Sequence, residues 1–226
     1  MTGKQLEKIL KNQLTDYFKE KNYKFSHEYE NTYYTKKESL YDIKLEVQSK
    51  SSSIGYADFN LTFWNIEDII LEIGLPNRTL KRMLEIYKNF TTIQDIGVRT
   101  IVKYDKLNPI ETEADCIEYC QRIVNYMENE GAQFIEKYSY LPNVLSEMDR
   151  LESEGKYWNE ILTGMAEHRF RGLIISKLCN DKRFFVKQEM LDAKFSTIPL
   201  LVNNGWLPYY EKLKERLKTV EPIYNI

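Results

Sequence analysis

The 226-residue chain is poor in the residues that interrupt regular structure. Its 9 glycines and 6 prolines are too few for long loops or a disordered linker. No stretch approaches the roughly 20 consecutive apolar residues of a membrane-spanning helix, so we expect no membrane association. Met1–Gln5 lead straight into an amphipathic stretch without the apolar segment of a secretory signal. The three cysteines, an odd number, suit reduced thiols better than a disulfide framework. We therefore expect a cytoplasmic protein.

An excess of charge of one sign is also missing. The net charge is −2, with 32 basic and 34 acidic residues. Residues 1–110 hold 17 basic and 15 acidic residues, and the remainder holds 15 and 19. Neither half carries the basic surplus that gathers a polyanion. Charge therefore gives no support to nucleic acid as the partner.

What the sequence does contain is a change of hydrophobic period. Apolar and polar residues alternate over 40–48 and again over 56–64, as in half-buried antiparallel strands. After about residue 110 the spacing becomes helical. We expect an α+β fold in which an N-terminal helix lies on an antiparallel β-meander, followed by a mostly α-helical C-terminal half. Asn108-Pro109 marks the boundary, because the residue before proline is disfavoured in a helix. The expected domains are 1–109 and 110–226, packed tightly together.

The expected elements of the first domain begin with an amphipathic helix over 3–20 that ends at Asn22 in a left-handed cap. A first strand starts at Tyr23 and extends toward Tyr34, and the serine-rich stretch 49–55 is a flexible connection. The remaining elements are the strands 40–48, 56–64 and 98–104 and the helices 66–73 and 80–90.

The second domain is expected to be helical throughout. Thr112-Glu113-Ala114-Asp115 has the pattern of a helix start, and the helix extends to about residue 139, with Gly131 as a weak point. Pro142 suits the first turn of the next helix. Further helices are expected over 164–180, 184–192 and 199–220.

Several short segments near the N-terminus occur in a recognisable order. An amphipathic helix over 6–14 is followed by Asn22-Tyr23-Lys24-Phe25, Asn31-Thr32-Tyr33-Tyr34, Gln48-Ser49-Lys50-Ser51 and Ala57-Asp58-Phe59-Asn60-Leu61. Over residues 6–64 the chain resembles a bacterial family of α+β domains of unknown function. This chain has Asn22 where such families often have glycine, and a left-handed cap accepts either residue. The resemblance implies an α+β fold, a bacterial cytoplasmic setting and an accessory or immunity-type binding role, and it supplies no catalytic residues.

Groups of metal-ligating residues are scarce. Cys116 and Cys120 lie one helical turn apart, but no second pair of cysteines or histidines has a matching spacing. Both are expected to be buried as small apolar residues, as is Cys179. Phosphate-binding loops, nucleophile elbows and paired zinc histidines are missing from the sequence. We therefore expect no metal and no cofactor.

Basic residues near His168 form one candidate site. Arg169, Arg171 and Lys177 follow it on the same expected helix and could bind an anion. The alternative is that these long side chains lie over the core with solvated ends.

Carboxylates on the strands form a second candidate. Asp42, Glu46 and Asp58 suggest a metal-dependent hydrolase or nuclease, since such enzymes hold magnesium with carboxylates on adjacent strands. However, Asp42, Lys44, Glu46 and Gln48 alternate with apolar residues, so ordinary amphipathicity places them on a solvent-exposed face.

Aromatic residues are the third candidate, since 17 tyrosines are unusual for this length. An exposed part of the aromatic set could bind a protein, with Tyr33, Tyr34, Tyr56 and Trp64 as candidates. Stacked bases on the sheet are an alternative, aided by Lys24, Lys36 and Lys37, although the basic aromatic run of RNA-binding sheets is missing.

The sequence favours a non-catalytic, cytoplasmic protein of accessory or immunity type that binds another protein. The binding residues we expect are the aromatics Tyr33, Tyr34, Tyr56 and Trp64 and the basic group His168, Arg169 and Arg171. A carboxylate-dependent hydrolase or nuclease and a nucleic-acid-binding module are the two alternatives.

Overall fold

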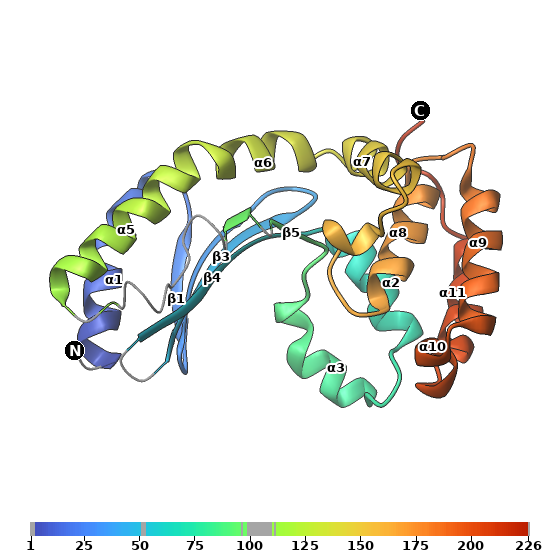
Figure 1. Ribbon diagram of the computed structural model, residues 1–226, viewed down its shortest axis with the longest axis horizontal. Coiled ribbons are helices and arrows are strands. Elements are labelled where there is room, and N and C mark those ends of the chain that lie inside the picture. Colours follow the sequence, from blue (N-terminus) through green and yellow to red (C-terminus); the bar gives the residue numbers. More distant parts are fainter. Residues whose placement is uncertain (1–2, 51–52, 96, 99–109, 111, 226) are drawn as a thin grey trace. The chain divides into compact units, whose positions relative to one another are not determined.

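The computed structural model describes residues 3–50, 53–95, 97–98, 110 and 112–225. It has an N-terminal helix, a five-stranded sheet and a long helical C-terminal part, which confirms the α+β class (Figure 1). The contacts divide the chain into two compact units, 1–61 with 94–139, and 62–93 with 140–226. The boundary expected between residues 109 and 110 thus lies inside the first unit, and residues 99–109 themselves lie outside the described part.

The first unit contains most of the sheet and the helices over 3–20, 113–128 and 130–138. Its elements are α1 (Gly3–Glu20), β1 (Lys24–Glu28), β2 (Asn31–Lys37), β3 (Asp42–Lys50), β4 (Ser53–Thr62), β5 (Ile93–Asp95), α5 (Glu113–Glu128) and α6 (Glu130–Tyr138). The strand order is β1-β2-β3-β4-β5, so the expected meander is present. The chain passes from one unit to the other within β4, after Leu61, within β5, after Ile93, and after Ser139.

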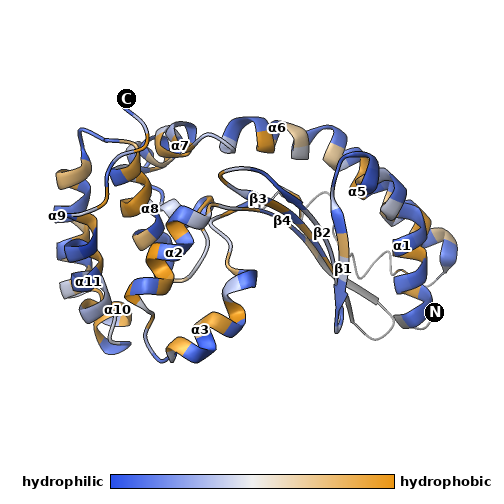
Figure 2. Cartoon of the chain, turned by 180° about the vertical axis from the view of Figure 1, so that it is seen from behind, coloured by the Kyte–Doolittle hydropathy of each residue, from blue (hydrophilic) through white to orange (hydrophobic). Residues whose placement is uncertain are grey.

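The second unit is helical. Its elements are α2 (Trp64–Ile73), α3 (Leu80–Ile86), η1 (Tyr87–Asn89), α7 (Leu141–Ser153), η2 (Trp158–Glu160), α8 (Glu167–Leu178), α9 (Phe184–Thr197), α10 (Pro199–Asn203) and α11 (Leu207–Leu217). Isoleucines at helical spacing make α2 strongly hydrophobic (Figure 2). Gly74 ends α2 at a φ of 82°, in agreement with the helix end expected at residue 73.

Two strand predictions were wrong. The segment from Tyr23 to Tyr34 is a hairpin rather than one strand, because Tyr29 has a φ of 56° and reverses the chain before Asn31 pairs with Glu28. The expected flexible stretch 49–55 belongs largely to strands, since β3 extends to Lys50 and β4 begins at Ser53. Pairing of neighbouring backbones outweighs the weak strand propensity of serine and glycine. The strand expected over 98–104 lies outside the described residues apart from Val98.

The end of the first helix at Asn22 and the start of the helix at Thr112 were predicted correctly, whereas the stretch 199–220 forms two helices, α10 and α11, rather than one. Asn22 has a φ of 65°, and the amide of Tyr23 donates to the carbonyl of Phe18, which closes α1. A capping box begins α5: the Thr112 hydroxyl accepts from the Asp115 amide at 3.2 Å, and Asp115 Oδ2 accepts from the Thr112 amide at 2.8 Å. The helix breaks at Asn129, two residues before the weak point expected at Gly131. The Asn129 side chain donates to the Asn125 carbonyl at 2.7 Å and thereby caps the end of α5.

The core of the first unit lies between the sheet and the helices of that unit. Tyr34 of β2 stacks on Phe18 of α1 with ring centroids 4.2 Å apart, and its hydroxyl donates to the Leu10 carbonyl. Phe59 of β4 packs against Tyr126 of α5 and Phe134 of α6 at 5.6 and 5.7 Å. These contacts bury the apolar face of the sheet.

A buried ion pair joins α2 to α8 in the second unit. Arg171 Nε donates to Glu67 Oε1 at 2.8 Å and Arg171 Nη2 to Glu67 Oε2 at 2.6 Å. The Thr92 hydroxyl donates to Glu67 Oε1 at 2.7 Å, and Arg171 Nη1 donates to the Thr163 carbonyl at 2.9 Å. The Glu67 side chain is fully buried and that of Arg171 is 7 % exposed. A two-pronged pair with these further hydrogen bonds satisfies both charges in the interior.

Replacing one member of this pair will destabilise the protein strongly. Glu67→Gln leaves the Arg171 charge buried without its partner, so we expect a loss of about 3–5 kcal/mol in the free energy of unfolding. The matched control is Glu72→Gln on the same helix, which removes an exposed pair with Arg216 and should cost less than about 1 kcal/mol. Urea titration followed by circular dichroism measures both. Equal losses in the two variants would contradict this account of the pair.

Candidate functional site

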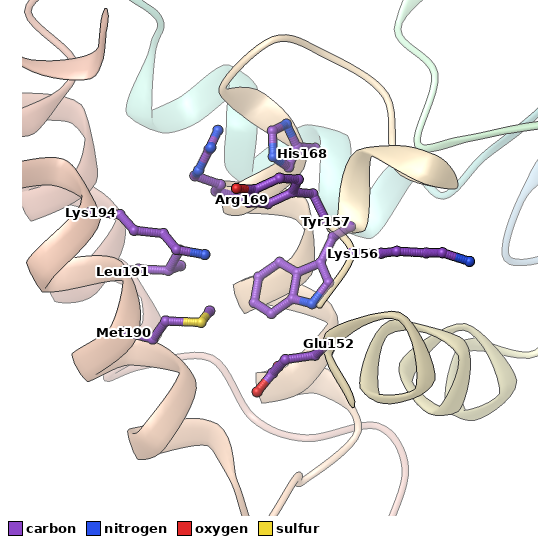
Figure 3. Close-up of a pocket in the computed structure, with 9 residues that line it drawn as sticks. Glu152, Lys156, Tyr157, His168, Arg169, Met190, Leu191 and Lys194 are labelled. Atoms are coloured by element: carbon purple, nitrogen blue, oxygen red, sulfur yellow. The ribbon is translucent and has the colours of Figure 1, made fainter. Parts of the chain in front are cut away.

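A pocket in the second unit contains His168 and Arg169 together with Lys156 and Lys194 (Figure 3). Its cavity volume is about 30 Å³, and its residues come from α7, the segment through η2, α8 and α9. We call it the cationic pocket and define it by its lining residues: Glu152, Lys156, Tyr157, Trp158, His168, Arg169, Met190, Leu191 and Lys194.

The end of α7 places the two aromatic residues of the pocket. Gly155 has a φ of 71°, its amide donates to the Glu152 carbonyl, and the amide of Lys156 donates to the Leu151 carbonyl. These two hydrogen bonds form a Schellman motif, which stops the helix and reverses the chain. The reversed chain leads directly into Tyr157 and Trp158.

Trp158 lies against α8 because Gly172 has no side chain. A Cβ atom at Gly172 would be 2.3 Å from Cε3 of Trp158, so no other residue fits beneath the ring. Trp158 is 5 % exposed, whereas its neighbour Tyr157 is 59 % exposed. One aromatic residue thus forms the inner wall of the cationic pocket and the other forms its rim.

Two cations in the pocket form no ion pair within the described part of the chain. Lys194 Nζ lies 5.5 Å from the ring centroid of Tyr157, and Arg169 makes one long hydrogen bond, to the Met165 carbonyl at 3.4 Å. Burial lowers the pKa of both groups, and the charge of Arg169 lowers that of Lys194 further. Lys156 points away from the pocket in Figure 3 and pairs with Glu154 at 2.8 Å. Arg169 and Lys194 thus make no ion pair among the described residues, although the charge of Glu152 in the same pocket favours the charged form of Lys194.

Glu152 is the one carboxylate that lines the pocket. Its Oε1 pairs with Nη2 of Arg183 at 2.6 Å, outside the lining. Its Oε2 is buried and accepts no hydrogen bond within the described part of the chain. A buried carboxylate oxygen that accepts no hydrogen bond lowers the stability of the folded chain. The pocket therefore combines unmatched cations with one unmatched acceptor.

His168 is a neutral member of the pocket. Its Nδ1 lies 2.9 Å from the Gly164 carbonyl, which makes that nitrogen the donor. Burial is the main cause that lowers its pKa to about 4, and the positive charges of Arg169 and Lys194 act in the same direction. His168 therefore carries no charge at neutral pH.

The structure separates the basic residues that the sequence grouped. His168 and Arg169 line the cationic pocket. Arg171 lies in the core ion pair with Glu67, which leaves it no surface for an anion. Lys177 lies near the Phe184 ring and lines a different surface depression. Side chains one or two residues apart on a helix point in different directions, which explains the separation.

The aromatic candidates belong to two units and differ in exposure. Tyr34 is fully buried, and Tyr33 is half-buried and accepts a hydrogen bond from Asn31 at 3.1 Å. The side chain of Tyr56 is outside the described part. Trp64 begins α2 in the second unit, half-buried with its ring centroid 5.0 Å from that of Tyr87.

The expectation of a solvent-exposed polar face on the central strands was wrong. Asp42 and Lys44 of β3 are each 8 % exposed, and Asp58 of β4 is 9 % exposed. Burial lowers the pKa of Lys44, opposed by the nearby Glu46, Asp58 and Asp42. Alternation separates the two faces of a strand, but it does not reveal that both are covered.

A metal site receives no support from these carboxylates. No three histidine, cysteine or acidic side chains lie close enough to hold a metal ion in the part of the chain that the structure describes. Cys116, Cys120 and Cys179 are buried and unpaired. The hydrolase or nuclease alternative stays a prediction.

Sequence reasoning missed Glu152, Tyr157 and Lys194 as members of the site. Lys194 was missed because the helix starting at Phe184 was expected to end at Asp192, whereas α9 continues to Thr197. Gly155 was a signal that could have revealed Tyr157, because a glycine after a helical stretch predicts a helix end and a turn. The two residues that follow the turn, Tyr157 and Trp158, are aromatic.

Comparison with protein families, with curated proteins and with solved structures finds no match to this chain. The resemblance over residues 6–64 therefore stays a prediction. Within the described residues, no helix combines the length and the apolar character required to cross a bilayer.

The burial of His168 predicts a pH dependence of stability. Its pKa is about 4 in the folded chain against 6.5 for a free side chain, so between these values only the unfolded chain binds the proton. Stability therefore falls as the pH is lowered through this window, by about 3 kcal/mol between pH 7 and 4. His168→Asn keeps a donor for the Gly164 carbonyl and cannot titrate. Urea unfolding at pH 7, 5.5 and 4 should show a smaller decline in the variant, and identical declines would refute the assignment.

Proposed function

We propose that this chain is a non-catalytic protein that binds another protein, and that the cationic pocket contacts an anionic group of that partner. One observation carries the proposal: Arg169 and Lys194 share a partly buried pocket with one carboxylate, Glu152, and neither forms an ion pair among the described residues. Two cations held in this way are destabilised by each other and by burial, and an anion from outside relieves both effects.

The chemistry of the pocket supports binding rather than turnover. His168 is neutral, and its Nδ1 is committed to the Gly164 carbonyl. Tyr157 offers an exposed aromatic rim, a residue type enriched in protein interfaces. A cation pair next to an exposed tyrosine is suited to hold an acidic group of a partner protein.

We further propose a cytoplasmic location and an accessory or immunity-type role, as in the bacterial family that residues 6–64 resemble. Three buried, unpaired cysteines are compatible with a reducing compartment.

Affinity capture with matched variants tests the proposal. Lys194→Glu reverses one charge of the pocket, whereas Lys212→Glu makes the same change at an exposed position on α11. We expect one specific protein to be captured from an extract of the source cells by the native chain and by Lys212→Glu, and capture by Lys194→Glu to fall at least tenfold. The absence of a partner above background, or equal capture by both variants, would oppose the proposal.

A further inference from the structure

The surface depression that Lys177 lines is a groove between α8, α9 and α11. These three helices pack against one another within the second unit (Figure 1). The groove has a cavity volume of about 470 Å³, against about 30 Å³ for the cationic pocket. A volume of this size lies in the range of ligand sites, so the groove can take a side chain together with part of its backbone. We call it the phenylalanine groove, after Phe184 and Phe185, which line it.

The two phenylalanines supply most of its apolar surface from the first turn of α9. Their ring centroids lie 5.3 Å apart in an edge-to-face arrangement, and Leu217 of α11 lines the same groove. Phe184 is half-buried, whereas Phe185 is 72 % exposed. Exposed aromatic side chains beside a groove are suited to anchor an apolar group of a partner.

Charged residues at helical spacing form the side of the groove that belongs to α11. Glu211 pairs with Lys214 at 3.0 Å, and Glu215 pairs with Lys218 at 2.6 Å. Lys214 also pairs with Asp192 of α9 at 2.9 Å. The charged residues that α11 contributes to the groove are therefore all paired within the chain.

Two polar side chains of the groove have no polar partner among the described residues. Lys177 of α8 is half-buried, and its Nζ lies 5.7 Å from the ring centroid of Phe184 without an ion pair. Gln188 follows Phe184 by one helical turn on α9. Its backbone carbonyl accepts a hydrogen bond from Tyr210, but its side-chain amide makes none. Lys177 therefore offers a positive charge, and Gln188 offers both a donor and an acceptor.

This combination favours a peptide over other occupants of an apolar groove. Lys177 calls for a carboxylate, the phenylalanines call for an apolar side chain, and a backbone peptide group matches both halves of the Gln188 amide. A fatty acid would meet the lysine and the phenylalanines but would leave the amide unmatched. A second copy of this chain, in a two-fold dimer, would bring the same unpaired lysine against the first one.

We propose that the phenylalanine groove binds a peptide segment of a partner protein in which an acidic and an apolar residue are neighbours. The acidic side chain pairs with Lys177, the backbone bonds to the Gln188 amide, and the apolar side chain packs on Phe185. The groove and the cationic pocket share no lining residue. This second site therefore goes beyond the proposed function and does not depend on Lys194.

The first test compares three probes on the native full-length chain. They are acetyl-leucyl-aspartyl-leucinamide, its uncharged asparaginyl counterpart, and decanoate as a lipid-like carboxylate. The NMR signals of the Phe184 and Phe185 ring protons report occupancy. We expect a saturable shift with the aspartyl peptide, and about fivefold weaker binding of the asparaginyl peptide and of decanoate. This comparison needs no variant, so it stands even if a substitution disturbs folding.

Matched variants then locate the bound peptide. Phe185→Ala removes the exposed ring, whereas Val186→Ala shortens its neighbour, which is 55 % exposed and lies outside the lining. Phe185→Ala should weaken the aspartyl peptide about fivefold, and Val186→Ala should leave its affinity unchanged. Lys177→Gln should lower the affinity of the aspartyl peptide to that of the asparaginyl one, and Lys194→Glu should have no effect.

Each other outcome overturns the inference. The absence of a shift with the aspartyl peptide, equal binding of the two peptides, or equal affinities in Phe185→Ala and Val186→Ala would exclude a peptide site in this groove. Decanoate that binds as tightly as the aspartyl peptide would identify a lipid-like carboxylate, and a dimer that Phe185→Ala abolishes would identify a second copy. Lys194-dependent capture of a partner together with failure of the aspartyl peptide would retain the proposed function and remove only this inference.

Discussion

The ion pair between Glu67 and Arg171 is the interaction on which the second unit depends. Both charges are withdrawn from water, and each is satisfied by a two-pronged contact and by a further hydrogen bond, from Thr92 to Glu67 and from Arg171 to the Thr163 carbonyl. Such a pair tolerates little displacement, because any shift of one helix leaves a charge unpaired in the interior. It therefore fixes the position of α8 on α2.

The position of α8 in turn builds the cationic pocket. Arg171 occupies the side of α8 that meets α2, while His168 and Gly172, four residues apart, share another side that faces the pocket wall. Trp158 rests on Gly172, and Arg169 enters the lining from the first turn. One helix, α8, thus supplies Arg171 to the buried ion pair and His168 and Arg169 to the pocket.

Buried cations elsewhere in the second unit form ion pairs, whereas Arg169 and Lys194 of the cationic pocket form none within the described part of the chain. Lys187 is fully buried, yet Asp149 and Asp181 each lie 2.6 Å from its Nζ. The chain therefore supplies acidic partners where a buried cation only holds the fold. Arg169 and Lys194 lack such partners among the described residues, and groups perturbed in this way concentrate at functional sites.

Local patterns predicted the class of fold and much of its local structure. Periodicity gave the helix at 3–20 and the strands near 40–48 and 56–64, and Thr112 and Asn22 gave correct ends of helices. What failed was the turn at Tyr29, which has no local signal in the sequence. The sequence cannot show that Tyr29 adopts a positive φ, since tyrosine rarely does so.

The candidate site was less predictable for the same reason. His168 and Arg169 were found from the sequence, but Arg171 pairs with a residue 104 positions away and Lys194 comes from a helix whose end was placed too early. Sequence patterns over a few residues cannot predict which of several neighbouring basic residues forms an ion pair with a residue distant in the sequence.

The most direct measurement is a double-mutant cycle on the buried pair, with Glu67→Met and Arg171→Met made singly and together and the free energies of unfolding obtained from urea titration. The account predicts that the double variant is more stable than either single variant, because each single change strands one buried charge and the double change strands none. If the losses of the two single variants simply add in the double variant, the pair is not what holds α8 in place.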